Sequence, residues 1–351
     1  MVIIGIDAHK YTHTVVAVDS QGRQLAVKTI GTTTADHLAL LAWARRHGEE
    51  LVWAVEDCRQ LSRRLERDLL AAGQRIVRVP PKLMTNMRDA ARSFGKSDPI
   101  DALAVARAAL REPDLPVAQL DGPERDVRLL VDHREDLVAE RTRIISRLRW
   151  HLHELDPSWQ PTARSLDRPR ALNQIAALLE GQAGIVARIA RDLVDRLRAL
   201  NADINALADE ITTLVEKLAP SLVAICGCGP LTAAKILGET AGITRFRSND
   251  AYARHNGTAP LPVWSSNRAR HRLSRRGNRQ LNAAIHRIAL TQAHYHPGAR
   301  ALIARRRANG DGGLEAIRVL KRRLSDVVYQ ALLTDAHAAI AQSTGSVRSA
   351  V

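Results

Sequence analysis

VIIGI (2–6), TVVAVD (14–19) and QLAVKTI (24–30) are three strand-like segments in close succession near the start of the chain. The first two are short apolar runs, and the third alternates apolar and polar residues, which is typical of a strand with one buried face. A tight turn at 20–22 joins the second segment to the third. This arrangement predicts an antiparallel meander.

Helix and strand patterns alternate after the meander. Apolar residues at helical spacing predict helices at 34–47 and 61–72, and the apolar runs LVWAVE (51–56) and RIVRV (75–79) predict strands. The order strand-strand-strand-helix-strand-helix-strand is that of ribonuclease H-like sheets. The sequence therefore predicts an α/β, RNase H-like domain over residues 1–115.

Two long helices are predicted in the middle of the chain. Over 193–218 the apolar positions recur at alternating steps of three and four, and a looser seam of this kind runs through 127–155. Two prolines break the pattern in a connector at 156–170. An antiparallel hairpin within one chain and a coiled coil that assembles protomers both fit, and the regularity of the seam favours assembly. We interpret 116–219 as a helical coiled-coil region.

The C-terminal part is expected to be mostly α-helical. Residues 220–342 are interpreted as one domain of short helices and glycine-rich turns, and 343–351 as a flexible tail. Residues 225–237 have the pattern of a helix-hairpin-helix, which presents backbone N–H groups to a phosphate, although an ordinary glycine-containing connector is the alternative. The candidate nucleic-acid contacts in this motif are Gly227, Gly229 and Lys235.

Positive charge is concentrated in one segment. The 351 residues include 52 Lys and Arg and 37 Asp and Glu, a net charge of +15. Residues 245–325 hold 18 of the bases, 17 of them Arg, against three acids, whereas bases and acids balance in the rest of the chain. Arginine suits bidentate contact with phosphate, so a nucleic acid partner is favoured over a merely solvated basic face. With 11 aromatic residues, backbone electrostatics rather than base stacking should dominate binding.

Composition also excludes several classes of protein. An apolar fraction of 45% is sufficient for folded cores and argues against disorder. No run approaches ~18 consecutive apolar residues, and the N-terminus lacks the pattern of a signal peptide. The three cysteines complete neither a disulfide framework nor a zinc site. We therefore expect a cytoplasmic protein with no membrane partner.

Four carboxylates from three segments are expected to meet at one edge of the sheet. Asp7 ends the first strand, Glu56 ends the fourth, and Asp98 and Asp101 share one face at the start of a helix that Asp98 caps. Each has an ordinary structural explanation when taken singly, but together they would repel one another unless divalent cations lie among them. Carboxylate oxygens select Mg²⁺, with Mn²⁺ as the alternative, and two such ions support phosphodiester chemistry.

A serine pair, Ser265 and Ser266, lies within an arginine-rich segment. A serine hydroxyl among guanidinium groups can attack a phosphate while the arginines stabilise the developing charge, although simple phosphate binding is the commoner role of such a hydroxyl. The sequence does not divide phosphate contact and charge stabilisation among the arginines. The candidates are Arg268, Arg270, Arg272, Arg275, Arg276 and Arg279.

Several ordered motifs together resemble the insertion-sequence one-ten family of bacterial transposases, over nearly the whole chain. The resemblance implies a RuvC-like domain of the D-E-D-D type and a C-terminal serine domain. It implies that Asp7, Glu56, Asp98 and Asp101 bind the metal. Ser265 would be the nucleophile, because it stands eight positions after Gly257, with Ser266 in reserve. The motifs are GIDAHK (5–10), AVED (54–57), GKSDPIDALAVA (95–106), GCGPLTAAKILGE (227–239), GTAPLPVWSSN (257–267) and SRRGNRQL (274–281).

The function implied by this resemblance is excision and insertion of a mobile element through a covalent phosphoserine link to DNA. It further implies donor and target DNA, a structured noncoding guide RNA, two dimers that form a tetramer on DNA, and a location at the bacterial nucleoid. Two alternatives remain open from the residues. One is a metal-dependent, Holliday-junction-type nuclease with a non-catalytic serine loop, and the other is a non-catalytic nucleic-acid-binding scaffold.

Overall fold

A computed structural model describes residues 1–351 except for several short segments. Contacts divide the chain into two units: unit 1 is Met1–Gly122 with Gly242–Gly277, and unit 2 is Pro123–Ala241 with Asn278–Val351. For 262–265, 268–272 and 342–348 only the backbone is described. Outside the description lie residues 57–60, 82, 85–86, 88–96, 113–114, 116, 119–121, 163, 266–267, 273–276 and 349–351.

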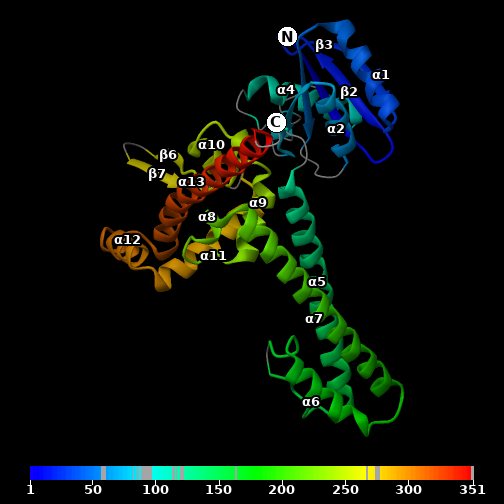
Figure 1. The fold of residues 1–351 in the computed structure, drawn as a ribbon, viewed down its shortest axis with the longest axis vertical. Helices are drawn as coiled ribbons and strands as arrows, with labels where there is room; N and C mark the ends of the chain where they lie inside the picture. Colours follow the sequence, from blue (N-terminus) through cyan, green and yellow to red (C-terminus); the bar gives the residue numbers. More distant parts are fainter. Residues whose placement is uncertain are drawn as a thin grey trace. The chain divides into compact units, whose positions relative to one another are not determined.

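Unit 1 is built on a five-stranded sheet in the order β3-β2-β1-β4-β5. The strands are β1 (Val2–Ala8), β2 (His13–Val18), β3 (Gln24–Ile30), β4 (Leu51–Glu56) and β5 (Arg75–Val79). β1, β2 and β3 form the predicted antiparallel meander, and β4 and β5 run parallel to β1 (Figure 1). The predicted order of strands and helices along the chain and the α/β class are confirmed.

Helices cover both faces of this sheet. Helices α1 (Thr34–Ala44) and α2 (Arg63–Ala71) pack on one face around the fully buried Trp53, and α4 (Asp98–Arg111) packs on the other. A capping box between Thr33 and Asp36 starts α1. Each strand of the central pair is buried on both faces, so β1 and β4 read as continuous apolar runs rather than alternating ones.

Gly5 lets α4 approach β1 at backbone distance. A Cβ atom at this position would lie 2.2 Å from the carbonyl oxygen of Ala102 and 2.6 Å from the Cβ atom of Ala106. The small side chains of α4 and the bare glycine therefore form one contact surface. This contact sets the height of α4 above the strand.

The other segment of unit 1, Gly242–Gly277, contains the short helix α10 (Asn249–His255) and a two-stranded ribbon of β6 (Leu261–Ser265) and β7 (Arg268–Arg272). Buried Tyr252 packs edge-on against Phe246, with ring centroids 5.3 Å apart. The sequence predicted only helices and turns here. The ribbon escaped prediction because β6 contains a proline and β7 is almost entirely charged or polar, neither of which is typical of strands.

Unit 2 begins with a helical hairpin. Helix α5 (Pro123–Leu155) and helix α7 (Ile185–Leu218) run antiparallel and pack together, and α6 (Pro169–Glu180) packs against α7 near their far end (Figure 1). Arg196 of α7 pairs with Glu140 of α5, and their apolar seams share one buried cluster. The seam therefore packs within one chain, as the hairpin alternative predicts, and assembly of protomers through it stays a prediction.

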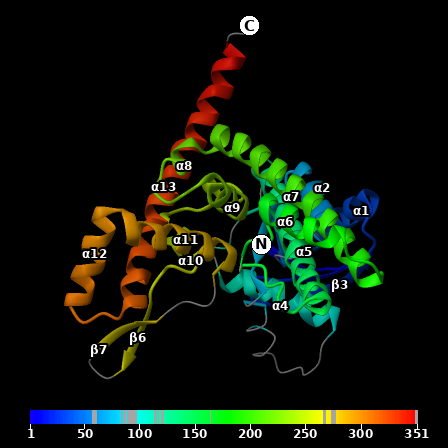
Figure 2. The same ribbon diagram turned by 90° about the horizontal axis from the view of Figure 1, so that it is seen from below.

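The rest of unit 2 consists of α8 (Pro220–Val223), α9 (Pro230–Thr240), α11 (Arg279–Tyr295), α12 (Pro297–Ala308) and α13 (Gly313–Arg348). Helix α9 is almost wholly buried and packs against α5, α7 and α11. Figure 2 shows α12 beside α13, to which a short turn joins it. The backbone of α13 continues as a helix to Arg348, and the flexibility predicted for 343–351 stays a prediction. None of the helices in the described residues is long and apolar enough to cross a membrane.

The contact at Gly5 makes a prediction about stability. Gly5→Val should lower the free energy of unfolding of unit 1 by about 3 kcal/mol or more, because the added atoms overlap the backbone of α4. Urea denaturation followed by circular dichroism measures the change. Gly181→Ala is the control, because nothing lies within 4 Å of a Cβ atom there. Equal stability of the Gly5→Val variant and the wild type would contradict the contact.

Candidate functional site

Two carboxylates and one imidazole meet at the carboxyl end of β1. Oδ2 of Asp7 lies 3.1 Å from Nε2 of His9, and Oδ1 of Asp98 lies 3.5 Å from that nitrogen. One ligand atom from each residue lies within 4.8 Å of the other two. Asp7 is buried, whereas the side chains of His9 and Asp98 are about half exposed. The three groups therefore form a cluster with a buried base and an open side.

The contact at Gly5 explains how Asp7 and Asp98 meet. Side chains alternate along a strand, so Asp7 lies on the same face of β1 as Gly5, the face that α4 covers. The first turn of α4 then lies beside Asp7. Ser97, not Asp98, is the N-cap residue, so the predicted cap is wrong by one position and Asp98 is the first residue of the helix.

Asp101 and Glu56, the other two predicted metal ligands, lie outside the group of three ligand atoms within 4.8 Å. Asp101 is buried on α4, and its charge acts on Asp7. Glu56 ends β4 one residue after Val55, the parallel partner of Ile6, so it lies level with Asp7 at the same sheet edge. All four predicted carboxylates thus belong to one edge of the sheet, and two of them are in the close cluster.

The pKa of Asp7 indicates that the positive charge of this cluster does not balance its carboxylates. Burial raises the pKa of the Asp7 carboxyl, His9 opposes this shift, and Asp101 and Asp98 reinforce it. A cation among these groups would offset their mutual repulsion. Oxygen ligands of this kind suit a hard divalent ion.

His9 is the residue of this cluster that sequence reasoning missed. It stands two positions after Asp7 in GIDAHK. A turn joins β1 to β2 there, in which the backbone N–H of His9 donates to the carbonyl oxygen of Thr12 at 3.0 Å. One signal was available in the sequence: histidine is a common metal ligand, and His9 stands close to the predicted ligand Asp7. The alternation of side chains along β1 could not place it, because His9 comes after the end of the strand.

Ser265 is the last residue of β6, and its partner in the ribbon is Arg268, the first residue of β7. Positions 268, 270 and 272 are every second residue of β7, so they belong to one face of the ribbon. Position 265 belongs to the same face, because it is the register partner of position 268. The predicted nucleophile is therefore the register partner of Arg268, and positions 270 and 272 follow on the same face, opposite Val263 and Leu261. Three other predicted residues, Ser266, Arg275 and Arg276, lie outside the described residues.

The two ends of the ribbon segment lie in close contact. A Cβ atom at Gly277 would lie 2.2 Å from the backbone nitrogen of Gly257, so glycine is required for this approach. Beside it, the fully buried Asn256 accepts hydrogen bonds at its Oδ1 from the backbone N–H and the hydroxyl of Thr258. The serine segment is therefore a loop closed at its base.

The predicted phosphate contact at Lys235 is wrong for this structure. Lys235 is 5% exposed, and its Nζ lies 2.8 Å from Glu135 and 3.3 Å from Asp132, both on α5. The ion pairs satisfy the buried ammonium and hold α9 against α5. Gly227 and Gly229 remain predicted contacts, and Gly229 is the N-cap residue of α9.

A buried carboxylate extends this network to the end of the serine segment. Glu239 lies 3.8 Å from Lys235 and accepts a hydrogen bond of 2.6 Å from the side-chain amide of Asn278. Oδ1 of Asn278 in turn accepts from the backbone N–H groups of Gln280 and Leu281 and caps α11. Glu239 of the motif at 227–239 and Asn278 of the motif at 274–281 are therefore joined within unit 2.

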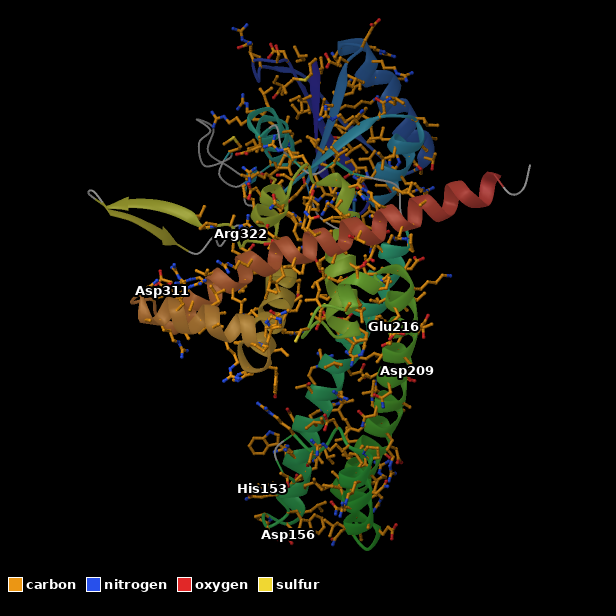
Figure 3. The ribbon with its side chains drawn as sticks, turned by 60° about the vertical axis from the view of Figure 1, so that its left-hand side comes forward. His153, Asp156, Asp209, Glu216, Asp311 and Arg322 are labelled. Carbon is orange, nitrogen blue, oxygen red and sulfur yellow. The ribbon has the colours of Figure 1, made fainter. Side chains whose placement is uncertain are left out.

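Exposed arginines lie on the C-terminal helices of unit 2. Arg279 begins α11 and is exposed, as a phosphate contact requires. Figure 3 shows Asp311 at the turn between α12 and α13 and Arg322 on α13, whereas Asp209 and Glu216 lie on α7. Asp311 pairs with Arg306. The exposed arginines of α12 and α13 up to residue 325 are Arg300, Arg305, Arg307, Arg318 and Arg323.

Comparisons with known proteins identify the class. A family model described as "Transposase" matches residues 4–157, and a second, described as "Transposase IS116/IS110/IS902 family", matches residues 219–304. The strand order of the sheet and the carboxylates at the edge of the sheet agree with an RNase H-like domain in a transposase. The class is therefore a transposase. The chain belongs to the IS116/IS110/IS902 family, which confirms the resemblance of its motifs.

Similar proteins cover nearly the whole chain. The 44.8 kDa protein of insertion element IS116 from Streptomyces clavuligerus is 29% identical over 95% of this chain and 94% of its own length. The 42 kDa protein of IS900 from Mycobacterium paratuberculosis is 27% identical over 94% of this chain and 95% of its own length. A structure of Thermus thermophilus RuvC with a Holliday junction substrate covers 31% of this chain and 91% of its own, with 19% identity and a TM-score of 0.25.

The burial of Lys235 predicts a stability defect without a binding defect. Lys235→Met should lower the stability of unit 2 by about 3 kcal/mol, because it removes the buried ammonium that pairs with Asp132, Glu135 and Glu239. The dependence of DNA affinity on salt should keep its slope. Arg279→Ala, which removes an exposed base, should reduce that slope by about one. Urea denaturation and filter binding at several salt concentrations measure the two effects, and a smaller slope for the folded Lys235→Met variant would contradict the structure.

A second buried lysine gives unit 2 a pH dependence. Nζ of Lys321 on α13 donates to Oδ1 of Asn282 on α11 at 2.5 Å, and burial lowers the pKa of Lys321 from 10.5 to about 8. The unfolded chain therefore binds the proton more strongly than the folded protein between about pH 8 and 10.5. The free energy of unfolding, relative to that of a variant without the Lys321 amine, should therefore rise as the pH increases from about 8 to 10.5 and level off at higher pH.

Lys321→Met provides the comparison. The wild type should gain up to about 3 kcal/mol relative to this variant between pH 8 and 10.5, because each unit of pKa shift corresponds to about 1.4 kcal/mol. Urea denaturation across this range measures the difference. Lys217→Met, at an exposed lysine of the same unit, should show no such gain. Parallel stability profiles for the wild type and Lys321→Met would refute the lowered pKa.

Proposed function

We propose that this transposase cuts and rejoins DNA to excise and insert its own element, with Ser265 as nucleophile and a divalent metal at the carboxylate edge. The observation that carries the proposal is the convergence of Asp7 and Asp98, from two separate segments, in a chain of a transposase family. Mg²⁺ is the proposed ion, with Mn²⁺ as the alternative. Asp7, Glu56, Asp98 and Asp101 would be its protein ligands.

The donor set fits such an ion. Asp7 and Asp98 have atoms close enough to share one ion, and Asp101 and Glu56 belong to the same edge. When bound, the ion supplies positive charge that polarises the scissile phosphate and stabilises the oxygens that attack and leave. The residues of this chain hold that charge in place. Asp7 anchors the site from a buried position, and Asp98 closes it from the solvent side.

The serine step is a phosphoryl transfer. The hydroxyl oxygen of Ser265 attacks a backbone phosphorus atom, and its proton passes to a base or to solvent. A bond forms between this oxygen and phosphorus, the bond to the deoxyribose oxygen breaks, and that oxygen takes up a proton. Attack by a strand-end hydroxyl reverses these changes and rejoins the DNA. Arginines in register with the serine, such as Arg268, would stabilise the charge on the phosphoryl oxygens.

The proposed partners follow from the family and from charge. Donor and target DNA would contact Arg268, Arg270, Arg272, Arg275, Arg276 and Arg279, together with Gly227 and Gly229. A structured noncoding guide RNA would select the target, and two dimers would form a tetramer on DNA. Family membership supports these proposals, and the basic C-terminal helices support the DNA contacts. A cytoplasmic, nucleoid-associated location is proposed on the same grounds.

The decisive experiment is trapping of a protein–DNA adduct. Wild-type protein incubated with labelled element-end DNA and Mg²⁺, then denatured, should retain covalently bound label. Ser265→Ala should abolish this adduct, because no other atom replaces the nucleophilic oxygen, and Ser266→Ala should retain it. Thr258→Ala, which removes a hydroxyl near the base of the same segment, controls for general damage to the loop.

The outcomes separate the proposed function from its alternatives. Cleavage without an adduct would favour the junction nuclease, in which the serine loop only holds DNA. Binding with neither cleavage nor adduct would favour the non-catalytic scaffold. Loss of the adduct in Ser266→Ala but not in Ser265→Ala would move the nucleophile by one position.

A further inference from the structure

We propose that His9 is a direct ligand of the metal ion at the carboxylate edge and that its imidazole shifts the preference of the site from Mg²⁺ toward Mn²⁺, relative to a site made of carboxylates alone. This inference rests on the proposed metal centre. It assigns a ligand that lies outside the four predicted carboxylates. It also states how this residue changes the relative affinity of the site for the two candidate ions.

The distances around Nε2 of His9 agree with shared coordination. Two ligand atoms at right angles on an octahedral ion lie ~3.0 Å apart when each is ~2.1 Å from it. Nε2 lies 3.1 Å from Oδ2 of Asp7 and 3.5 Å from Oδ1 of Asp98. Small side-chain movements would therefore bring the three atoms onto three adjacent positions of one ion. The remaining positions would face the open side of the cluster.

The fold holds this nitrogen at the carboxylates. His9 and Asp7 are two residues apart, and the hydrogen bond from the His9 backbone to Thr12 closes the turn that follows β1. Asp98 comes from α4, whose position the contact at Gly5 sets. The His9 side chain is 46% exposed and that of Asp98 is 55% exposed, so an ion and its water molecules have access.

The chemistry of the ligand set decides the choice of ion. Mg²⁺ prefers oxygen ligands and releases water reluctantly, whereas imidazole nitrogen is a favourable ligand for first-row transition metals. Two carboxylates and one imidazole therefore shift the preference toward Mn²⁺ relative to an all-carboxylate site. The competing explanation is that His9 only donates a hydrogen bond to the carboxylates. In that case its loss would not remove any bond to the ion.

Metal binding to the full-length protein tests the inference without measuring activity. Electron paramagnetic resonance of free Mn²⁺ gives its affinity, and competition gives the affinity of Mg²⁺. His9→Ala should weaken Mn²⁺ binding about tenfold or more, since loss of even an outer hydrogen-bond partner costs 10–100-fold, and should change Mg²⁺ binding much less. His294→Ala, at an exposed histidine of unit 2, should leave both affinities unchanged.

A spectroscopic signature distinguishes ligation from hydrogen bonding. Electron spin echo measurements on the frozen Mn²⁺ complex should show coupling to ¹⁴N in the wild type and lose it in His9→Ala and His9→Gln. The glutamine variant keeps a hydrogen-bond donor at this position. Circular dichroism confirms that each variant is folded, which the exposure of His9 favours.

The result also separates this inference from the proposed function. Mn²⁺ binding that depends on Asp7 but shows no ¹⁴N coupling in the wild type would overturn the role of His9 as a ligand, whatever the affinity of His9→Ala, and would leave the metal centre in place. An absence of Mn²⁺ binding in the wild type would overturn both. Asp7→Asn supplies the comparison, because it removes charge from the one buried carboxylate of the cluster.

Discussion

The candidate metal centre depends on the close contact between α4 and β1 at Gly5. A side chain at this position would overlap Ala102 and Ala106, so only a glycine permits the observed height of the helix above the strand. Because Asp7 follows on the same face of β1, the first turn of α4 brings Asp98 beside it. A larger residue would raise α4 and separate the two carboxylates. The packing of Gly5 against the alanines of α4 thus determines whether Asp7 and Asp98 meet at the edge of the sheet.

Unit 2 shows that a polar residue in a motif can serve as an internal partner rather than as a contact for a ligand. Lys235 and Glu239 lie in the motif at 227–239 and Asn278 lies in the motif at 274–281, and the three form one buried or half-buried network. Their ionic and amide groups satisfy one another, so their roles are those of internal partners. Lys321 is likewise buried. The number of bases in the C-terminal segment therefore overstates the positive charge available to DNA.

The sequence predicted the α/β domain well because burial gives a strong periodic signal. The strands at 51–56 and 75–79 have the predicted bounds, since each is an apolar run that ends at a polar residue or a proline. The ribbon of β6 and β7 was missed because β6 contains a proline and β7 is almost entirely charged or polar, so that pairing between the two strands replaces an alternating apolar pattern. His9 was missed because its position depends on a turn. The burial of Lys235 depends on α5, which lies about a hundred residues away in sequence, and no local pattern reports such a contact.

The negative charge of the carboxylate edge affects how the DNA backbone, which is also negative, can approach it. Asp7, Asp98 and Asp101 place negative charge at the sheet edge, where the basic side chain in contact with Asp7 and Asp98 is His9. A phosphate would be repelled from this edge unless a cation is bound first or together with it. Metal and DNA must then favour each other's binding at the proposed site, and by linkage the effect is equal in both directions. The arginines can attract the DNA backbone, but only a cation at the edge makes the approach of a scissile phosphate to these carboxylates favourable.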